Sequence, residues 1–311
     1  MKKAPFFVLL LASITLTVSG CTATVEVTEK GVEIESFSAD FSSVYSGENV
    51  RFSMLVRNTG TSDAAHVFTE VLGIDQSWGP NPGQEKLPNE QECRYSGSHF
   101  SLLAPEPDNG VPGQAHQCTW NYEAPSLSAG QSITYDVTAR VFYRYSSITT
   151  TILTFGSYDE IRELQNSGQP LPSETTVSSQ GPIRITIDTT GPIRFSEDED
   201  EVGLTLYVTV ENIGGGTVCS AENPNDCKPY PGDGVEKQNK VKIEFPAASN
   251  MVFSEECGRE ITVWSGSSNS YSCEAKATGL QNQAMTQRTI AASSAYSYYT
   301  DKEISVTVSG Y

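Results

Sequence analysis

The chain is poor in basic side chains, and this scarcity narrows the classes of partner it can bind. It has 20 Lys and Arg residues against 38 Asp and Glu residues, a formal net charge of −18 at pH 7. Nucleic acids and anionic lipid surfaces are recognised through basic patches. We therefore expect no nucleic-acid partner. Charged residues make up only 19% of the chain, which favours a β-rich exported protein over a helical one.

Motifs of catalysis are also missing. The sequence has no Gly-x-Ser-x-Gly elbow, phosphate-binding loop, His-Glu-x-x-His or Cys-x-x-Cys motif. It has three histidines: His66, His99 and His116. A metal ion shared by His99 and His116 is one alternative, but neither lies at a ligand-like spacing from another donor. We expect ordinary loop histidines, no resident cofactor and no enzymatic activity.

Long apolar runs are confined to the N-terminus. Lys2 and Lys3 precede the apolar stretch 4–18, which closes on Val18-Ser19-Gly20-Cys21. The stretch is shorter than the roughly 20 residues of a spanning helix, so residues 1–20 are predicted to be a signal peptide. Its end resembles a lipobox, which predicts a lipid on Cys21 and attachment to the outer face of the cell membrane. The alternative is ordinary cleavage and free secretion.

The cysteine count supports the lipid. Seven cysteines leave one without a partner, and lipidation of Cys21 would use it. The other six are predicted to form disulfides between neighbours in sequence: Cys93 with Cys118, Cys219 with Cys227, and Cys257 with Cys273. Disulfides of this kind are typical of an oxidising, extracytoplasmic compartment. Cys257–Cys273 is expected to close a hairpin.

An internal repeat divides the chain into two copies. Residues 50–60 align with residues 204–214 at an offset of 154, and both end at Asn-x-Gly. Alternate positions are apolar in both copies, which indicates strands with one buried face: Val50, Phe52, Met54 and Val56, then Leu204, Leu206, Val208 and Val210. Tyr143-Arg144-Tyr145 and Tyr296-Ser297-Tyr298 match at an offset of 153. We interpret this as a duplication.

The fold predicted from this repeat is all-β, with two tandem β-sandwich domains joined by a short helix-containing linker. The predicted boundaries are a tether at 21–30, a first sandwich at 31–157, a linker at 158–181 and a second sandwich at 182–311. The longest clear strand is expected at 133–145, and a helix at 158–165.

A family resemblance rests on the start of each copy. Gly47-Glu48-Asn49-Val50, the alternating strand, and Val56-Arg57-Asn58-Thr59-Gly60 resemble the CARDB-like and related immunoglobulin-like domains of prokaryotic, notably archaeal, cell-surface and S-layer-associated proteins. The second copy keeps Val210-Glu211-Asn212-Ile213-Gly214 and then departs through its cysteine insertion. The resemblance implies that both β-sandwich domains are immunoglobulin-like. It also implies a non-catalytic role in adhesion, spacing or assembly, and carries over no catalytic residues.

Acidic loops and aromatic side chains provide the remaining candidate sites. Asp198, Asp200, Asp108 and Asp233 are weak candidates for Ca²⁺ ligands, without the ordered spacing of a calcium loop. For glycans, Trp78 and Tyr230 are the better surface candidates. Trp120 and Trp264 are expected in the core, although they and Tyr299 also count among the aromatic candidates.

The resulting hypothesis is a lipid-anchored, extracytoplasmic surface protein whose partners are other surface proteins or glycans. One alternative is a subunit of a surface filament or lattice that pairs through edge strands such as 304–308. A hydrolase of envelope polymers, with clustered acids in a cleft between the domains, is a less favoured alternative.

Overall fold

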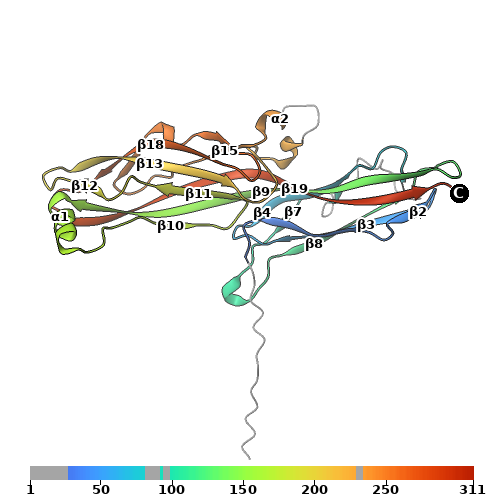
Figure 1. The fold of residues 1–311 in the computed structure, drawn as a ribbon, viewed down its shortest axis with the longest axis horizontal. Helices are drawn as coiled ribbons and strands as arrows, with labels where there is room; N and C mark the ends of the chain where they lie inside the picture. Colours follow the sequence, from blue (N-terminus) through green and yellow to red (C-terminus); the bar gives the residue numbers. More distant parts are fainter. Residues whose placement is uncertain (1–26, 81–91, 94–98, 229–233) are drawn as a thin grey trace, which may run out of the picture.

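The computed structural model describes residues 27–80, 92–93, 99–228 and 234–311. Residues 1–20, Cys21, Tyr230 and Asp233 lie outside this part of the chain, together with the predictions made for them. The fold is mostly β, with several sheets arranged in two lobes of one elongated body (Figure 1). Among the described residues, no helix has the length and apolar character needed to cross a membrane.

Within its described residues, the first lobe has eight strands of its own: β1 (Val32–Ala39), β2 (Ser43–Tyr45), β3 (Asn49–Asn58), β4 (Ala64–Leu72), β5 (Gly79–Pro80), β6 (Glu92–Cys93), β7 (Phe100–Leu102) and β8 (Ala115–Glu123). The order β1-β3-β8-β5 forms a four-stranded sheet. Alternate side chains of β3 are buried, as the apolar period of this strand predicts. A short 3₁₀ helix, η2 (Pro107–Asn109), precedes β8.

The second lobe repeats this plan with β10 (Thr175–Ser178), β11 (Ile183–Asp188), β12 (Ile193–Phe195), β13 (Glu201–Asn212), β14 (Thr217–Cys219), β15 (Lys240–Lys242), β16 (Met251–Phe253), β17 (Glu260–Thr262) and β18 (Ser268–Thr278). Its four-stranded sheet has the order β11-β13-β18-β16. In the described part of this lobe, three short helices lie between the strands: η3 (Pro224–Cys227), α2 (Gly234–Lys237) and η4 (Glu255–Cys257).

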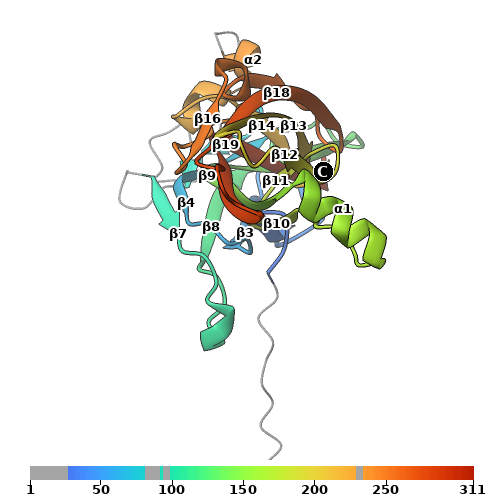
Figure 2. The same ribbon diagram turned by 90° about the vertical axis from the view of Figure 1, so that its left-hand side faces the viewer.

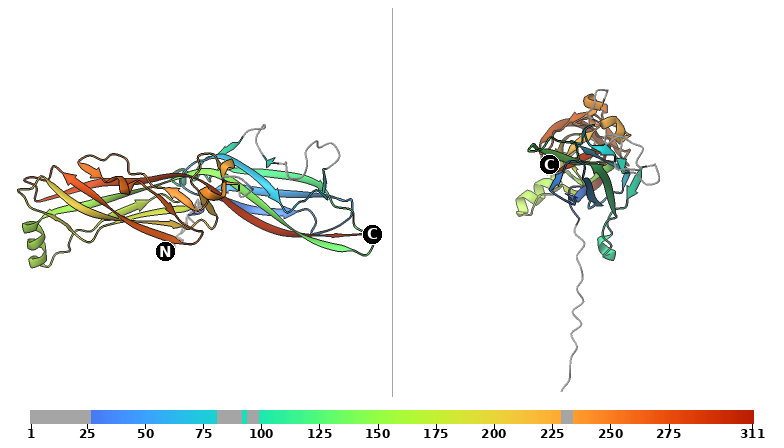
Figure 3. Two further views of the ribbon diagram at one scale, coloured as in Figure 1. Left: turned by 90° about the horizontal axis from the view of Figure 1, so that it is seen from above. Right: turned by 90° about the vertical axis from the view of Figure 1, so that its right-hand side faces the viewer.

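Two very long strands join the lobes. β9 (Ser132–Ser157) and β19 (Met285–Ser309) pair antiparallel along their whole length, from Ser132 opposite Ser309 to Gly156 opposite Met285. At about 3.3 Å per residue, a strand of 26 residues spans about 85 Å. The ribbon runs through both lobes from one end of the body to the other (Figure 3).

The register of this ribbon explains the repeat. Arg144 lies opposite Ser297, and these positions are 153 residues apart, which is the offset of the tyrosine triplets. The two copies are therefore related by a local two-fold axis that passes through this pair of residues, at the junction of the lobes. Each copy places the first half of its long strand in one lobe and the second half in the other. The lobes thus share strands, and one hydrophobic core continues through both.

The segment 158–181 begins with the expected helix. α1 (Tyr158–Ser167) starts after Ser157, whose side chain accepts a hydrogen bond from the Glu160 amide, and it ends at Gly168 in the left-handed conformation. α1 lies at the far end of the second lobe (Figures 1 and 2). Strand β10 then pairs with β9. This segment therefore packs along the second lobe as well as connecting the two copies.

Two strand predictions were wrong. The segment 304–308 is not a free edge at its end, because β19 there lies between β9 and β2, which pairs in parallel with Thr307–Ser309. Cys257 and Cys273 do not close a hairpin of paired strands, because β17 pairs with β15 whereas β18 pairs with β13 and β16. The short polar loops between these strands carry no sequence signal for the sheet that each strand joins.

Candidate functional site

Four tyrosines fill the junction of the lobes. Tyr143 and Tyr145 come from β9, and Tyr296 and Tyr298 lie opposite them on β19. All four are buried, and the ring centroids of Tyr143 and Tyr298 are 5.7 Å apart. Burial raises the pKa of Tyr145 to about 12, and it raises the pKa of Tyr143 and Tyr296 well above the usual value. These hydroxyls stay protonated at physiological pH and act as hydrogen-bonding groups.

The Asn-x-Gly turn of the second copy is held by one of these tyrosines. The Tyr298 hydroxyl donates to Oδ1 of Asn212 at 2.6 Å and accepts from the Gly216 amide at 2.8 Å. Nδ2 of Asn212 donates to the Gly216 carbonyl at 3.0 Å. Asn212 and Tyr298 are both fully buried, so every bond in this network is shielded from water.

The first copy repeats two bonds of this network. Nδ2 of Asn58 donates to the Ser62 carbonyl at 2.8 Å, and the Ser62 amide donates to the Tyr145 hydroxyl at 3.0 Å. A Cβ atom on Gly60 would collide with the Tyr145 hydroxyl, so the glycine of the motif is required by close packing. The repeated motif therefore fastens each lobe to the shared ribbon.

An aromatic row lies on the outer face of the sheet beside this junction. Phe68 of β4, Phe142 of β9 and Tyr299 of β19 are in register and form a small cluster apart from the main core. The rings of Phe68 and Phe142 stack with centroids 4.8 Å apart. Nζ of Lys228, from the second copy, lies 5.0 Å from the Phe68 centroid, within the range of a cation–π interaction.

A charged row follows two residues further along the same strands. Glu70, Arg140 and Asp301 are in register. Arg140 binds Asp301 at 2.6 Å, and Lys228 binds Glu70 at 3.2 Å. Burial lowers the pKa of Arg140, but the hydrogen bond and charge of Asp301 outweigh burial and raise it. Strands β4, β9 and β19 thus present a row of paired charges beside the aromatic row.

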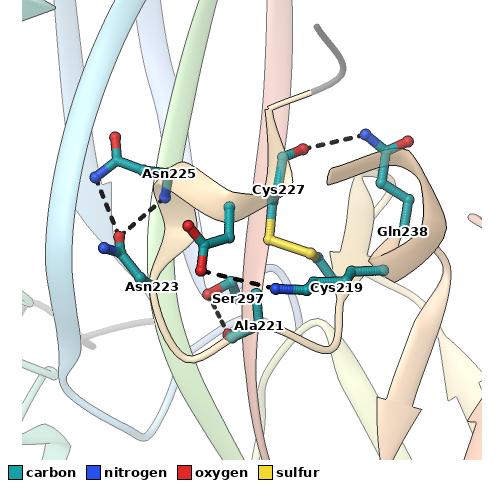
Figure 4. The surroundings of a disulfide bond; sticks show 9 residues. Cys219, Ala221, Asn223, Asn225, Cys227, Gln238 and Ser297 are labelled. Carbon is teal, nitrogen blue, oxygen red and sulfur yellow. Dashed lines mark hydrogen bonds and ion pairs between the residues drawn. A yellow bond between two sulfur atoms is a disulfide. The ribbon is translucent and has the colours of Figure 1, made fainter. Parts of the chain in front are cut away.

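The cysteine insertion of the second copy covers this face (Figure 4). Cys219 and Cys227 are joined, and Oγ of Ser297 on β19 donates to the Ala221 carbonyl at 2.7 Å within the closed loop. Nδ2 of Asn225 lies 3.3 Å from Nε2 of His99 in the first copy. The insertion therefore ties the two copies together over the ribbon.

The six cysteines that the structure describes form three disulfides, in the pairing that the sequence predicts: Cys93–Cys118, Cys219–Cys227 and Cys257–Cys273. The calcium candidates that the structure describes lie in different lobes. Asp108 lies exposed on η2 in the first lobe, whereas Asp198 and Asp200 lie exposed in the turn before β13 of the second lobe.

His99 and His116 have different surroundings. The His99 ring stacks on Phe68 with centroids 5.1 Å apart. Nε2 of His116 lies 3.8 Å from Sγ of Cys93. The ligand atoms of Cys93, His116 and Cys118 lie within 4.8 Å of one another. Sequence analysis missed this group, although His116 and Cys118 are two residues apart and so share a strand face.

Two aromatic predictions were wrong. Trp78 is fully buried, with its ring 5.2 Å from that of Tyr135, although it lies in a Pro/Gly-rich segment. Trp264 is 62% exposed because β17 ends at Thr262, so that the tryptophan belongs to the following turn. Trp120 is buried as expected. Tyr299 is also buried, within the aromatic row.

Comparisons with known proteins find distant likenesses alone. No protein-family model matches the chain, and no curated protein matches it. Spo0M, a sporulation control protein from Bacillus subtilis, aligns over 78% of this chain and 90% of its own with 7% identity and a TM-score of 0.21. Red sea bream transglutaminase aligns over 89% and 31%, with 11% identity and a TM-score of 0.18. The CupB6 tip adhesin from Pseudomonas aeruginosa aligns over 93% and 99%, with 8% identity and a TM-score of 0.15. These scores assign neither a fold nor a function, and the immunoglobulin-like resemblance stays a prediction.

Proposed function

We propose that this chain is a non-catalytic protein of the cell surface, anchored by a lipid on Cys21, that holds two binding ends apart as an adhesion, spacer or assembly module. The observation that carries the proposal is the β9–β19 ribbon. Every residue from Met285 to Ser309 is paired with β9. Two domains on a flexible linker move independently, whereas an unbroken ribbon with a shared core resists bending between the lobes.

The residues at the start of the described chain contact the body near its middle. The Thr28 amide donates to the Thr59 carbonyl at 2.7 Å, and the Tyr143 hydroxyl donates to the Lys30 carbonyl at 3.1 Å. Val27 follows Cys21 by six residues in the sequence, and a fully extended chain of this length spans at most about 20 Å. A lipid on Cys21 would therefore hold the body near the membrane by its centre, with both ends projecting sideways.

The disulfides and the exposed surface fit the same proposal. The described residues form three disulfides, which are typical of proteins from an oxidising, extracytoplasmic compartment. Trp264, 62% exposed, replaces Trp78 as the aromatic candidate for stacking on a glycan or on a partner protein.

The test is made on protein purified from its native membrane. Intact mass is expected to show a chain that begins at Cys21 and carries a lipid, and small-angle scattering of the delipidated protein is expected to fit one rigid, elongated particle about 85 Å long. An unmodified N-terminus would overturn the anchor. A scattering profile of two independently moving lobes would overturn the spacer.

A filament subunit is the second candidate, and an open strand edge favours it. Ser293 exchanges both backbone hydrogen bonds with Glu244, so alternate residues of β19 direct their amide and carbonyl groups away from β9. Thr289 and Ala291 share this direction, and no described strand pairs with them there. They line a groove whose opposite side is formed by Pro246–Asn250. An extended strand of another chain would fit this edge.

Sedimentation of the purified protein separates the two candidates. A filament subunit is expected to form larger particles as its concentration rises. In that case Thr289→Pro, which removes an amide that the ribbon does not use, is expected to abolish the growth. A single species at all concentrations would argue against the filament.

A further inference from the structure

The three disulfides differ in their exposure to solvent. Cys219, Cys227 and Cys257 are 0% exposed, and Cys118 and Cys273 are 1% and 2% exposed. Among the six cysteines of the described chain, Cys93 alone is partly exposed. Thiol–disulfide exchange requires access of a thiolate to one of the two sulfur atoms. The Cys93–Cys118 bridge is therefore the one open to reduction in the folded protein.

The same bridge lies beside a third metal-ligating side chain. Nε2 of His116 is 3.8 Å from Sγ of Cys93, and the ligand atoms of Cys93, His116 and Cys118 all lie within 4.8 Å of one another. Around tetrahedral zinc, with Zn–S of about 2.3 Å and Zn–N of about 2.0–2.1 Å, neighbouring ligand atoms are separated by roughly 3.6–3.8 Å. The histidine and Cys93 already have this separation.

The surrounding strands hold the three side chains in place. His116 and Cys118 lie on the same face of β8, and Cys93 lies on β6, where it pairs with Thr69 of β4. The Thr69 hydroxyl donates to Sγ of Cys118 at 3.3 Å, a bond of the kind that supports a metal-bound thiolate. The Phe100 ring lies 4.2 Å from the His116 ring and restricts its rotation.

We propose that Cys93, Cys118 and His116 form a metal site that opens when the disulfide is reduced. A dithiol transfers two electrons and two protons to the bridge and becomes a disulfide itself, and Cys93 and Cys118 become thiols. A zinc-type divalent cation then displaces the two thiol protons to solvent and is bound by two thiolates and the imidazole, with water as the fourth ligand.

The ligand set determines which cations fit. Two thiolates and an imidazole select zinc and chemically similar transition metals, whereas Ca²⁺ and Mg²⁺ prefer oxygen ligands. While the bridge is intact, the sulfur atoms carry no thiolate charge and the site is closed. Metal binding would therefore respond to the redox conditions around the protein, independently of its role as a spacer.

Limited reduction tests the first step. The mature protein is treated with increasing dithiothreitol, and free thiols are alkylated and located by peptide mass. Cys93 and Cys118 are expected to be alkylated before the other four cysteines. Earlier alkylation of Cys257 and Cys273, or of Cys219 and Cys227, would overturn the proposal.

Cobalt binding tests the second step. The selectively reduced protein is expected to bind one Co²⁺ per chain and to develop a thiolate-to-cobalt absorption band, whereas the oxidised protein develops none. His116→Ala is expected to weaken cobalt binding at least tenfold, and His99→Ala is the matched control that leaves it unchanged. His116→Asn serves as a second variant if His116→Ala fails to fold, as judged by near-ultraviolet circular dichroism. Equal cobalt binding by the oxidised and reduced proteins, or by the His116 variants and the reduced parent, would overturn the proposal.

Discussion

Removing the Tyr298 hydroxyl provides a quantitative test of how the repeated turn is held on the ribbon. Tyr298→Phe keeps the buried ring and deletes the oxygen that donates to Oδ1 of Asn212 and accepts from the Gly216 amide. Both partner groups would then be buried without this bond. Leaving a buried polar group unsatisfied costs about 1–3 kcal/mol, so the two together predict a loss of about 2–6 kcal/mol in the free energy of unfolding.

The first copy and an exposed tyrosine supply matched comparisons. Tyr145→Phe removes one acceptor, for the Ser62 amide in a partly buried contact, and is expected to cost about 1–2 kcal/mol. Tyr158 is 53% exposed, so Tyr158→Phe is expected to change stability by less than about 0.5 kcal/mol.

The assay is urea-induced unfolding followed by tryptophan fluorescence, because Trp78 and Trp120 are buried and report on the core. The expected order of destabilisation is Tyr298→Phe, then Tyr145→Phe, then Tyr158→Phe. A free energy of unfolding for Tyr298→Phe within about 0.5 kcal/mol of the parent would refute the reasoning, since the hydroxyl would then contribute nothing net to the fold.

Three further predictions concern packing, charge and pH. A Cβ atom on Gly113 would collide with the Asn58 carbonyl, whereas one on Gly203 would meet nothing. Gly113→Ala is therefore expected to lower the free energy of unfolding by about 1–3 kcal/mol, and Gly203→Ala is expected to change it little. Urea unfolding measures both effects. Lys228→Met keeps an apolar side chain over the aromatic row but removes the ion pair of Glu70, which is 8% exposed. The free energy of unfolding is expected to fall by about 1–3 kcal/mol. A double-mutant cycle with Glu70→Gln that shows no coupling would contradict this prediction. Burial raises the pKa of Tyr145 to about 12, from about 10 in the unfolded chain. The tyrosine therefore ionises first in the unfolded state, and the free energy of unfolding is expected to fall as the pH rises from 10 to 12. Urea midpoints that do not change between pH 9 and pH 11.5 would argue against this prediction.

The repeat and the strand pattern could be predicted from the sequence, because both depend on local signals. The alternating apolar residues of 50–56 and 204–210 are the buried faces of β3 and β13, except that Leu204, near one end, is partly exposed. The neighbouring cysteines form the predicted bridges because each pair is separated by 25 residues or fewer.

The full length of the shared ribbon could not be predicted from the strand pattern. The residues after Tyr145 read Ser-Ser-Ile-Thr-Thr-Thr, which indicates an exposed end rather than the interior of a strand. In the structure their polar groups are paired across the lobe: Oγ of Ser147 donates to the Ile183 carbonyl at 2.6 Å, and Oγ1 of Thr149 donates to the Ile185 carbonyl at 2.7 Å. These hydrogen bonds pair buried hydroxyls with carbonyls that are distant in the sequence, so no local sequence pattern predicts them.

The candidate sites were predicted less well than the fold. The charged row of Glu70, Arg140 and Asp301 depends on the pairing of three strands that are far apart in sequence. Lys228 reaches that row because the cysteine insertion folds back over the first copy. Trp78 and Trp264 were placed by composition and alternation, but the strand boundaries decided their burial.

The most direct test of the account is to divide the protein after Gly168, where α1 ends. Fragments 27–168 and 169–311 each keep their own disulfides, but each holds only one strand of the β9–β19 ribbon. Sedimentation and circular dichroism are expected to show that neither fragment alone is a folded monomer, and that mixing them restores the β spectrum in a 1:1 complex. A fragment 27–168 that sediments as a folded monomer and unfolds cooperatively would contradict the shared ribbon.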